Sequence, residues 1–258
     1  MARAPIAFVT GARRGIGRGI AHALADAGFD VVVNDLVDDA ATRETLAAIG
    51  AKGRRAAFVQ GSIADLPAHA KFIDAAFSAF GSVDCLVNNA GIQVKVRGDL
   101  LDVTPESFDE ILAVNLRGTF FLTQAVAKRM LAERRSTGDP PRSIVTISSA
   151  NARLVSLNRA EYCFAKTGLA MLSQLFALRL AEADVACYEV RPGVIRTDMT
   201  AVAKDRYDKL IAEGLTPIRR WGEPEDVGRT VAALASGALP FSTGDAFHVD
   251  GGLHIKAF

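Results

Sequence analysis

Short apolar segments alternate with longer segments of helical periodicity along the whole chain, and this alternation limits the fold more than any other sequence feature. A strand, a helix and a second strand in succession predict parallel pairing, because the helix returns the chain to the start of the next strand. No linker-like break divides the pattern. We therefore expect one α/β domain over residues 1–258, a doubly wound parallel sheet with helices on both faces. The predicted strands are Ile6–Thr10, Phe29–Asp35, Ala56–Val59, Val83–Asn88, Ser143–Ser149, Ala186–Val190 and Ala246–Val249.

Helical periodicity fills most of the intervals between these strands. One interval differs, because residues 194–222 are polar, mixed and interrupted by glycine and proline. We expect this excursion to be a mobile loop and helix that can close over a substrate. The predicted helices are Gly15–Gly28, Asp39–Gly50, Pro67–Phe80, Pro105–Arg134, Glu161–Leu180 and Pro224–Ala235.

The first strand runs directly into the glycine-rich turn TGARRGIG, Thr10–Gly17, which opens the first helix. Glycines permit a tight turn and let the backbone approach a pyrophosphate at a helix N-terminus, where unpaired N–H groups favour anions. The spacing differs from the general G-x-G-x-x-G fingerprint. The prediction of a dinucleotide-binding turn therefore depends on its position between a strand and a helix. The residues predicted to contact a dinucleotide here are Gly11, Arg13, Arg14, Gly15, Ile16 and Gly17.

Asp35 ends the second strand, eighteen residues after Gly17. A carboxylate there can accept hydrogen bonds from the adenosine ribose and repels a 2′-phosphate, which favours NAD over NADP. Arg13 and Arg14 favour the opposite choice, since they could reach a phosphate. The alternative is that Asp35 only caps the following turn.

Tyr162 and Lys166 lie one helical turn apart, thirteen and seventeen residues after Ser149. A cation about 4 Å from a phenol favours the phenolate by roughly 4 kcal/mol at an effective dielectric constant near 20. The pair therefore predicts a tyrosine that exchanges protons near neutral pH, with Ser149 binding the same substrate oxygen. The alternative is an ordinary solvated helix face, where this spacing is common.

These motifs resemble the short-chain dehydrogenase/reductase family over Ile6 to about Leu253, and in overall pattern its 3-oxoacyl-acyl-carrier-protein reductases. TGARRGIG and Asn88–Gly91 (NNAG) match its cofactor motifs, and four residues match its catalytic tetrad. The resemblance implies a Rossmann-type fold, Tyr162 as acid/base, Lys166 as the group that lowers its pKa and holds the nicotinamide ribose, and Ser149 as the polarising hydroxyl. It also implies that Asn115 holds a water that links Lys166 to solvent.

The same resemblance extends the cofactor site over the ends of other strands. Ser62 stands where many members have an aspartate that contacts adenine. A serine hydroxyl can still bond the ring amine, so we expect retained but altered adenine contacts. Asn89, Ala90 and Gly91 follow the fourth strand. The remaining residues implied to contact the dinucleotide are Ile63, Pro192, Gly193, Ile195 and Thr197, together with Tyr162 and Lys166.

Polar side chains near the expected pocket favour a polyol or sugar-like secondary alcohol as the substrate of an NAD-dependent oxidoreductase. Solvated loop surface is the alternative interpretation of each of them. A 3-oxoacyl-acyl-carrier-protein reductase is the second hypothesis, and a non-catalytic dinucleotide sensor is the third. The predicted substrate residues are Gln93, Lys95, Arg97, Asn151, Arg153 and Asn158.

Several classes of function are not indicated. The net charge is +1 and the basic residues are scattered, so no nucleic-acid surface is expected. No apolar run approaches a membrane span, and Met1–Pro5 does not resemble a signal peptide. Three unpatterned cysteines suggest a reducing, cytoplasmic location. The four histidines are too dispersed in sequence to predict a metal site, and the family resemblance implies a homotetramer.

Overall fold

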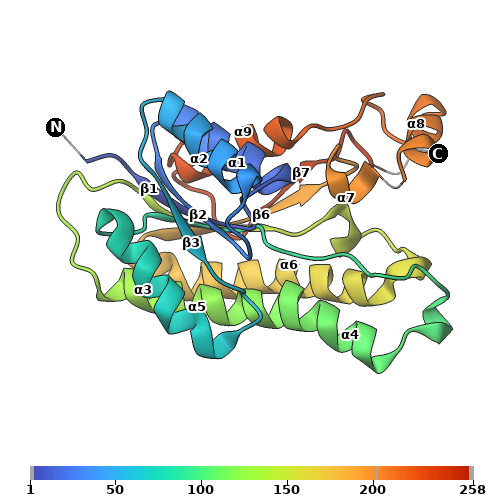
Figure 1. The fold of residues 1–258 in the computed structure, drawn as a ribbon, viewed down its shortest axis with the longest axis horizontal. Helices are drawn as coiled ribbons and strands as arrows, with labels where there is room; N and C mark the ends of the chain where they lie inside the picture. Colours follow the sequence, from blue (N-terminus) through green and yellow to red (C-terminus); the bar gives the residue numbers. More distant parts are fainter. Residues whose placement is uncertain (1–2, 202, 256–258) are drawn as a thin grey trace.

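Seven parallel strands form one sheet in the order β3-β2-β1-β4-β5-β6-β7 (Figure 1). This computed structural model describes residues 3–201 and 203–255. The chain reverses direction across the sheet between β1 and β4, which is where doubly wound folds bind ligands. The predicted fold class and all seven strands are therefore confirmed. Their bounds are β1 Ile6–Thr10, β2 Asp30–Asp35, β3 Ala56–Gln60, β4 Cys85–Asn88, β5 Arg142–Ile147, β6 Val185–Pro192 and β7 Ala246–Val249.

Helices cover both faces of the sheet, with α1, α2 and α9 on one face and α3, α5 and α6 on the other (Figure 1). The apolar strand β2 divides its side chains between the two layers. Val31 and Val33 pack in the core beneath α1 and α9, whereas Val32 packs in the core beneath α3 and α5. The run Val31–Val33 is apolar at every position because neither face of the strand meets water there. The helices are α1 Gly15–Asp26, α2 Ala40–Ala51, α3 His69–Phe80, α4 Pro105–Leu112, α5 Thr119–Ala132, α6 Ala160–Leu180, α7 Asp198–Ala201, α8 Lys204–Ala212 and α9 Pro224–Ala235.

The prediction of one regular α-helix over Pro105–Arg134 is wrong. It consists of α4, a π-helical turn over Ala113–Gly118, and α5. Two contacts accompany the wider turn. The Asn115 side chain binds the backbone of Ile92, and a Cβ on Gly118 would lie 2.4 Å from the Ile63 carbonyl oxygen. Single π turns inside α-helices often occur at functional sites.

The excursion at residues 194–222 contains the short helices α7 and α8 beside the carboxyl edge of the sheet (Figure 1). Its two ends are paired by backbone hydrogen bonds, Arg196 N to Gly222 O at 2.8 Å and Gly222 N to Val194 O at 3.0 Å. The excursion is thus closed at its base, and its motion stays a prediction. Among the described residues, no helix has both the length and the apolar character needed to cross a membrane.

Candidate active site

The turn between β1 and α1 is packed so closely that two of its glycines leave no room for a side chain. Gly11 has a φ of +62°, and a Cβ on Gly17 would lie 2.1 Å from the Gly11 carbonyl oxygen. Asn89 fastens this turn to the end of β4, since its Nδ2 donates to the carbonyls of Thr10 and Gly11 at 2.8 and 3.0 Å. The first turn of α1 has no side-chain cap and no acidic residue, so its N–H groups can bind an anion.

Gly17→Ala is expected to destabilise the protein by about 3 kcal/mol, because the new methyl group overlaps backbone that cannot move aside. Gly50→Ala is the matched control, since Gly50 lies in α2 and a Cβ there meets nothing within 4 Å. The control should gain up to about 1 kcal/mol from improved helix propensity. Urea unfolding measures both changes. Equal stability of the two variants would contradict the close packing of the turn.

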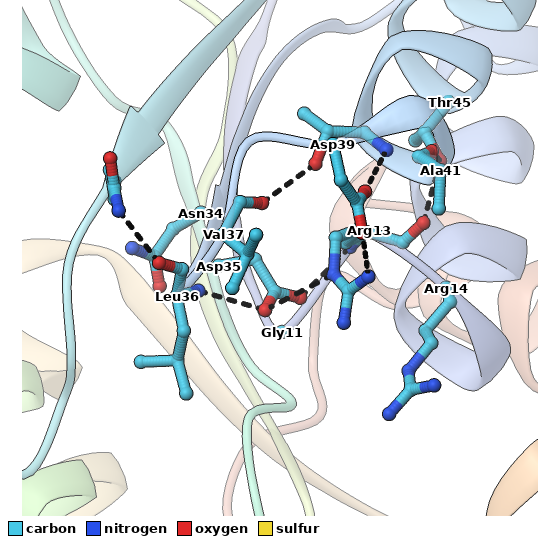
Figure 2. A network of polar contacts seen from close by, with 12 residues as sticks. Gly11, Arg13, Arg14, Asn34, Asp35, Leu36, Val37, Asp39, Ala41 and Thr45 are labelled. Atoms are coloured by element: carbon cyan, nitrogen blue, oxygen red, sulfur yellow. Dashed lines mark hydrogen bonds and ion pairs between the residues drawn. The ribbon is translucent and has the colours of Figure 1, made fainter.

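Asp35, at the end of β2, is held in place by three contacts (Figure 2). Its carboxylate accepts from the backbone N–H groups of Leu36 at 2.8 Å and Arg13 at 3.2 Å, and it lies 3.7 Å from the Arg13 guanidinium. That guanidinium also forms an ion pair of 2.5 Å with Asp39. Asp39 is fixed in turn as the N-cap of α2, where its side chain accepts from Thr42 N. Two carboxylates thus share one arginine beside the glycine turn.

The segment after β6 lies across from the glycine turn. A Cβ on Gly15 would lie 3.5 Å from the Thr197 side chain, and a Cβ on Gly193 would overlap Asp250. Arg14 extends to the surface, where its guanidinium lies 3.3 Å from Asp198. The ends of β1, β4 and β6 therefore face a common region, as the co-location of motifs at strand ends predicts.

Tyr162 and Lys166 are buried on the first two turns of α6. The Lys166 Nζ atom donates to the Ile147 carbonyl at 3.0 Å and lies 5.5 Å from the centre of the Tyr162 ring. Ser149 follows β5, and its hydroxyl accepts from Asn151 N at 3.1 Å. The Ser149 side chain also acts on the Tyr162 hydroxyl and lowers the pKa of the phenol. The serine, the tyrosine and the lysine are thus gathered at one place, as predicted from their spacing.

Burial is the largest influence on both titratable groups. It raises the pKa of the Tyr162 phenol, against the opposing effects of the Ser149 hydrogen bond and the Arg159 charge. It lowers the pKa of Lys166 to about 8, against the opposing effect of the Glu189 carboxylate. The prediction that the lysine leaves the phenol with a depressed pKa is therefore wrong for this structure. The neighbouring charge favours the phenolate, but the cost of desolvating the phenolate in this buried position is larger.

Asn115 sits in the π turn with no exposed surface. Its amide closes a pair of hydrogen bonds with Ile92, accepting from N at 2.8 Å and donating to O at 2.9 Å. A Cβ on Gly91 would lie 3.1 Å from the Asn115 Oδ1 atom and 3.7 Å from Lys166 Nζ. The NNAG segment, Asn115 and Lys166 therefore form one packed unit.

Known proteins share this arrangement over nearly the whole chain. The family model described as Enoyl-(Acyl carrier protein) reductase matches residues 11–254. The chain belongs to the short-chain dehydrogenase/reductase family. The protein is therefore an NAD(P)-dependent oxidoreductase that interconverts CH–OH and keto groups of small-molecule substrates. The sensor hypothesis, which requires a non-catalytic protein, is set aside.

Three known members of the family are similar to this short-chain enzyme over nearly their whole length. The chain is 34% identical to the 3-oxoacyl-[acyl-carrier-protein] reductase FabG of Staphylococcus epidermidis, over 96% of this chain and 98% of that one. It is 35% identical to L-rhamnose 1-dehydrogenase (NAD(P)(+)) of a Sphingomonas species, over 96% of each chain. A crystal structure of a 3-oxoacyl-[acyl-carrier protein] reductase from Brucella melitensis in complex with NAD has a TM-score of 0.96, 50% identity and full coverage of both chains.

The residues present fit the nicotinamide dinucleotide that this family implies. The glycines of the turn allow a pyrophosphate to approach the backbone closely. The partly exposed Asp35 carboxylate can accept hydrogen bonds from ribose hydroxyls. Ser62 follows β3 and retains a half-buried hydroxyl, which accepts from Ala64 N at 3.3 Å. Ile63 and Ile195 are buried in the core, so only their backbone can reach a ligand. Ile16 likewise packs against the core.

The predicted substrate residues lie in different surroundings. Asn151 is buried and has a local role, because its Nδ2 donates to Leu154 O at 2.8 Å. Lys95 points into solvent and pairs with Glu110 at 2.7 Å. Arg97 contributes to the electrostatics of Tyr162 and so lies near the reacting group. Arg153 is exposed, and Asn158 is half-buried and accepts a hydrogen bond from Ser156 Oγ. Gln93 has a buried Oε1 atom that makes no hydrogen bond within the described residues.

Asp39 and Arg159 were not predicted from the sequence. Asp39 is one of three nearby acidic residues, and no pattern shows which of them pairs with Arg13. Arg159 lies in the turn before α6, with its guanidinium 5.5 Å from the centre of the Tyr162 ring. Its spacing of three residues from Tyr162 is a helical signal that could have identified it.

Proposed function

We propose that this enzyme reduces a 3-oxoacyl thioester to the 3-hydroxyacyl thioester, with NADH as its preferred cofactor. The observation that carries the proposal is the full-length likeness, at 50% identity, to the Brucella melitensis protein named as a 3-oxoacyl-[acyl-carrier protein] reductase and solved with NAD. The staphylococcal relatives with the same named activity add support.

The charges around Arg13 support NADH over NADPH. A 2′-phosphate near Asp35 would meet a carboxylate, and Arg13 is already shared between Asp35 and Asp39. Two charges about 5 Å apart interact by roughly 3 kcal/mol at an effective dielectric constant near 20. Repulsion from Asp35 therefore outweighs what a partly neutralised Arg13 could offer.

Positive charge lies near the reacting tyrosine, because Arg159 and Arg97 both act on Tyr162 electrostatically. This charge would stabilise the negative charge that develops on the reacting oxygen of either candidate substrate. The phosphate of a phosphopantetheine arm lies at the far end of the arm from the thioester, so these arginines do not distinguish a thioester from a polyol. The choice of the thioester therefore depends on the relatives named above.

The positions of the side chains support a separate role for each of them in the reaction. The cofactor supplies or accepts the hydride. Tyr162 would donate its hydroxyl proton to the ketone oxygen on reduction, and Ser149 would hold that oxygen with a hydrogen bond. Lys166 would stabilise the resulting phenolate by its charge. Asn115 would keep the segment beside Lys166 in place through its paired bonds with Ile92.

A sugar dehydrogenase is the second candidate. The relative named L-rhamnose 1-dehydrogenase is as similar to this chain as the reductases of Staphylococcus epidermidis. Gln93 and Asn158 could bind hydroxyl groups, and Gln93 Oε1 is a buried acceptor with no partner among the described residues.

A single kinetic panel separates the two candidates. Acetoacetyl-CoA with NADH or NADPH should be compared with L-rhamnose and a set of polyols with NAD⁺ or NADP⁺. The proposal expects acetoacetyl-CoA with NADH to give the highest kcat/KM, by at least about tenfold. Higher kcat/KM for a sugar would favour the second candidate, and higher kcat/KM with NADPH would contradict the cofactor assignment.

The outer face of α6 supports a homotetramer, as the family resemblance implies. This helix buries one side against the sheet and exposes apolar side chains on the other, with Leu178 83% exposed. An apolar groove between α5 and α6, lined by Phe120, Leu131 and Leu175, continues that surface. A water-exposed surface of this kind is typical of an interface between protein chains. The cytoplasmic location remains a prediction of the sequence.

Leu175→Glu/Leu178→Glu is expected to dissociate the assembly without unfolding the chain, because both side chains are largely exposed within one chain. Light scattering should give the wild type four times the 27.4 kDa chain mass and the variant a smaller multiple. Circular dichroism checks that the variant remains folded. A wild-type mass equal to one chain would contradict the tetramer.

A further inference from the structure

A histidine, an aspartate and a second histidine converge where β7 ends. The Asp250 Oδ2 atom lies 2.8 Å from His254 Nδ1 and 3.5 Å from His248 Nδ1. The two imidazole rings are stacked, with their centres 3.8 Å apart and their planes inclined by 24°. One potential ligand atom from each of the three side chains lies within 4.8 Å of the other two. The prediction that the histidines are too dispersed to cluster is therefore wrong for this pair.

One nitrogen atom of this cluster lacks a hydrogen-bond partner among the described residues. His248 Nδ1 is buried and makes no hydrogen bond with the described residues. A buried polar atom without a partner is costly. Asp250 is almost fully buried and is held rigidly, because its Oδ1 accepts from Gly252 N at 2.9 Å. His254, by contrast, keeps 35% of its side chain exposed, which leaves a path from solvent.

The geometry points to a binding site for a borderline divalent metal ion, with Zn²⁺ as the best match, formed by His248, Asp250 and His254. Two imidazole nitrogens and a carboxylate oxygen form a common zinc ligand set, with a fourth position open to water. Ligands about 2.0 Å from a tetrahedral ion lie roughly 3.3 Å from one another. The separation of His248 from Asp250 already meets this requirement. His254 must withdraw from Asp250 by about 0.5 Å and rotate out of its stack on His248, because a bound ion lies in the plane of each imidazole ligand. The partial exposure of His254 leaves room for this rotation.

The site joins parts of the chain that border the candidate active site. His248 lies in β7 beside Arg191 of β6, and Asp250 packs against Gly193. The next two residues, Gly251 and Gly252, pack against Thr216–Ile218 at the end of the excursion. A bound ion would tie the turn at His254 to the sheet at this place. Its role is therefore to fix the position of the excursion, without contact with the reacting groups.

The test is a Zn²⁺ titration of the chelator-treated full-length protein by calorimetry, repeated with Co²⁺ to record its visible absorption spectrum. Wild type is expected to bind about one Zn²⁺ per chain, to show the bands of tetrahedral Co²⁺, and to gain roughly 5 °C in Tm at saturating Zn²⁺. His254→Gln and His248→Gln should each weaken binding at least about tenfold. His254 is partly exposed, so its variant is expected to fold.

His22→Gln is the matched control, because His22 lies on α1, away from this cluster, and is half-buried. It should bind Zn²⁺ as the wild type does. Absence of Zn²⁺ binding at micromolar concentration would overturn the proposal. Binding that is unchanged in both His248→Gln and His254→Gln would overturn it as well, since the ion would then be held elsewhere. These outcomes do not depend on the identity of the substrate.

Discussion

Tyr162→Phe is expected to lower kcat by about a thousandfold while leaving dinucleotide affinity within about twofold of wild type. The substitution removes one hydroxyl from a buried ring, so the shape of the site is kept. General acid catalysis by a positioned side chain contributes roughly 10²–10⁴-fold to a rate. Steady-state kinetics with acetoacetyl-CoA gives kcat, and fluorescence titration with NADH gives the affinity.

Tyr188→Phe is the matched control for this substitution. The Tyr188 hydroxyl donates to Leu239 O at 3.2 Å, and its ring packs beneath α9, on the sheet face opposite to α6. Loss of that bond should cost about 1 kcal/mol of stability and leave kcat unchanged. If Tyr162→Phe retained wild-type turnover, Tyr162 would not be the proton donor.

Asp35→Asn/Asp39→Asn is expected to shift the ratio of kcat/KM for NADH to that for NADPH by about a hundredfold in favour of NADPH. The double substitution removes the carboxylate that repels a 2′-phosphate and frees Arg13 from both of its partners. A change of roughly 3 kcal/mol in this interaction corresponds to about a hundredfold in affinity. Asparagine is also a good N-cap, so α2 should keep its start at residue 39.

Asp38→Asn provides the comparison. Asp38 is exposed and lies 3.8 Å from Arg43, with no contact to Arg13. The substitution removes one negative charge from the same loop, where the double variant removes two, and it should leave the cofactor ratio within about twofold of wild type. A similar shift in this control would mean that the net charge of the loop, and not the position of Asp35 and Asp39, sets the preference. Unchanged selectivity in the double variant would contradict the role of Asp35.

The sequence predicted those parts of the site that backbone and topology determine. The glycine turn could be placed because Gly11 and Gly17 occupy positions that no other residue can fill. Asp35, Asn89 and Ser149 could be grouped because each follows a parallel strand, and such ends meet at one edge of the sheet. Tyr162 and Lys166 could be paired because helical geometry alone brings them together.

The features that escaped prediction depend on side-chain conformation and packing. The Arg13–Asp39 ion pair requires a particular path of the loop after β2, which no periodicity encodes. The π turn at Asn115 is accompanied by contacts with the distant Ile92 and Ile63, which no local sequence pattern shows. The pKa of Tyr162 depends on how deeply the ring is buried, and a sequence gives no burial depth for one side of a helix.

The convergence of His248 and His254 was also not predicted from the sequence. The two histidines lie six positions apart in the sequence, and this spacing matches no metal motif. The turn after β7, with positive φ at Gly251 and Gly252, folds the chain back so that the two rings stack. A cluster produced by such a turn becomes visible only with coordinates.

Transfer of deuterium from labelled NADH tests the central claim most directly, because it follows the reacting atom itself. Acetoacetyl-CoA should be reduced by the wild type with NADH labelled at C4 on one face, and in parallel with NADH labelled on the other. Mass spectrometry of the 3-hydroxybutyryl-CoA then counts the deuterium at the carbinol carbon. We expect one label to give a product with one deuterium and the other label to give none. Unlabelled product, or no product, from both would contradict the assignment of this protein as an NADH-dependent 3-oxoacyl thioester reductase.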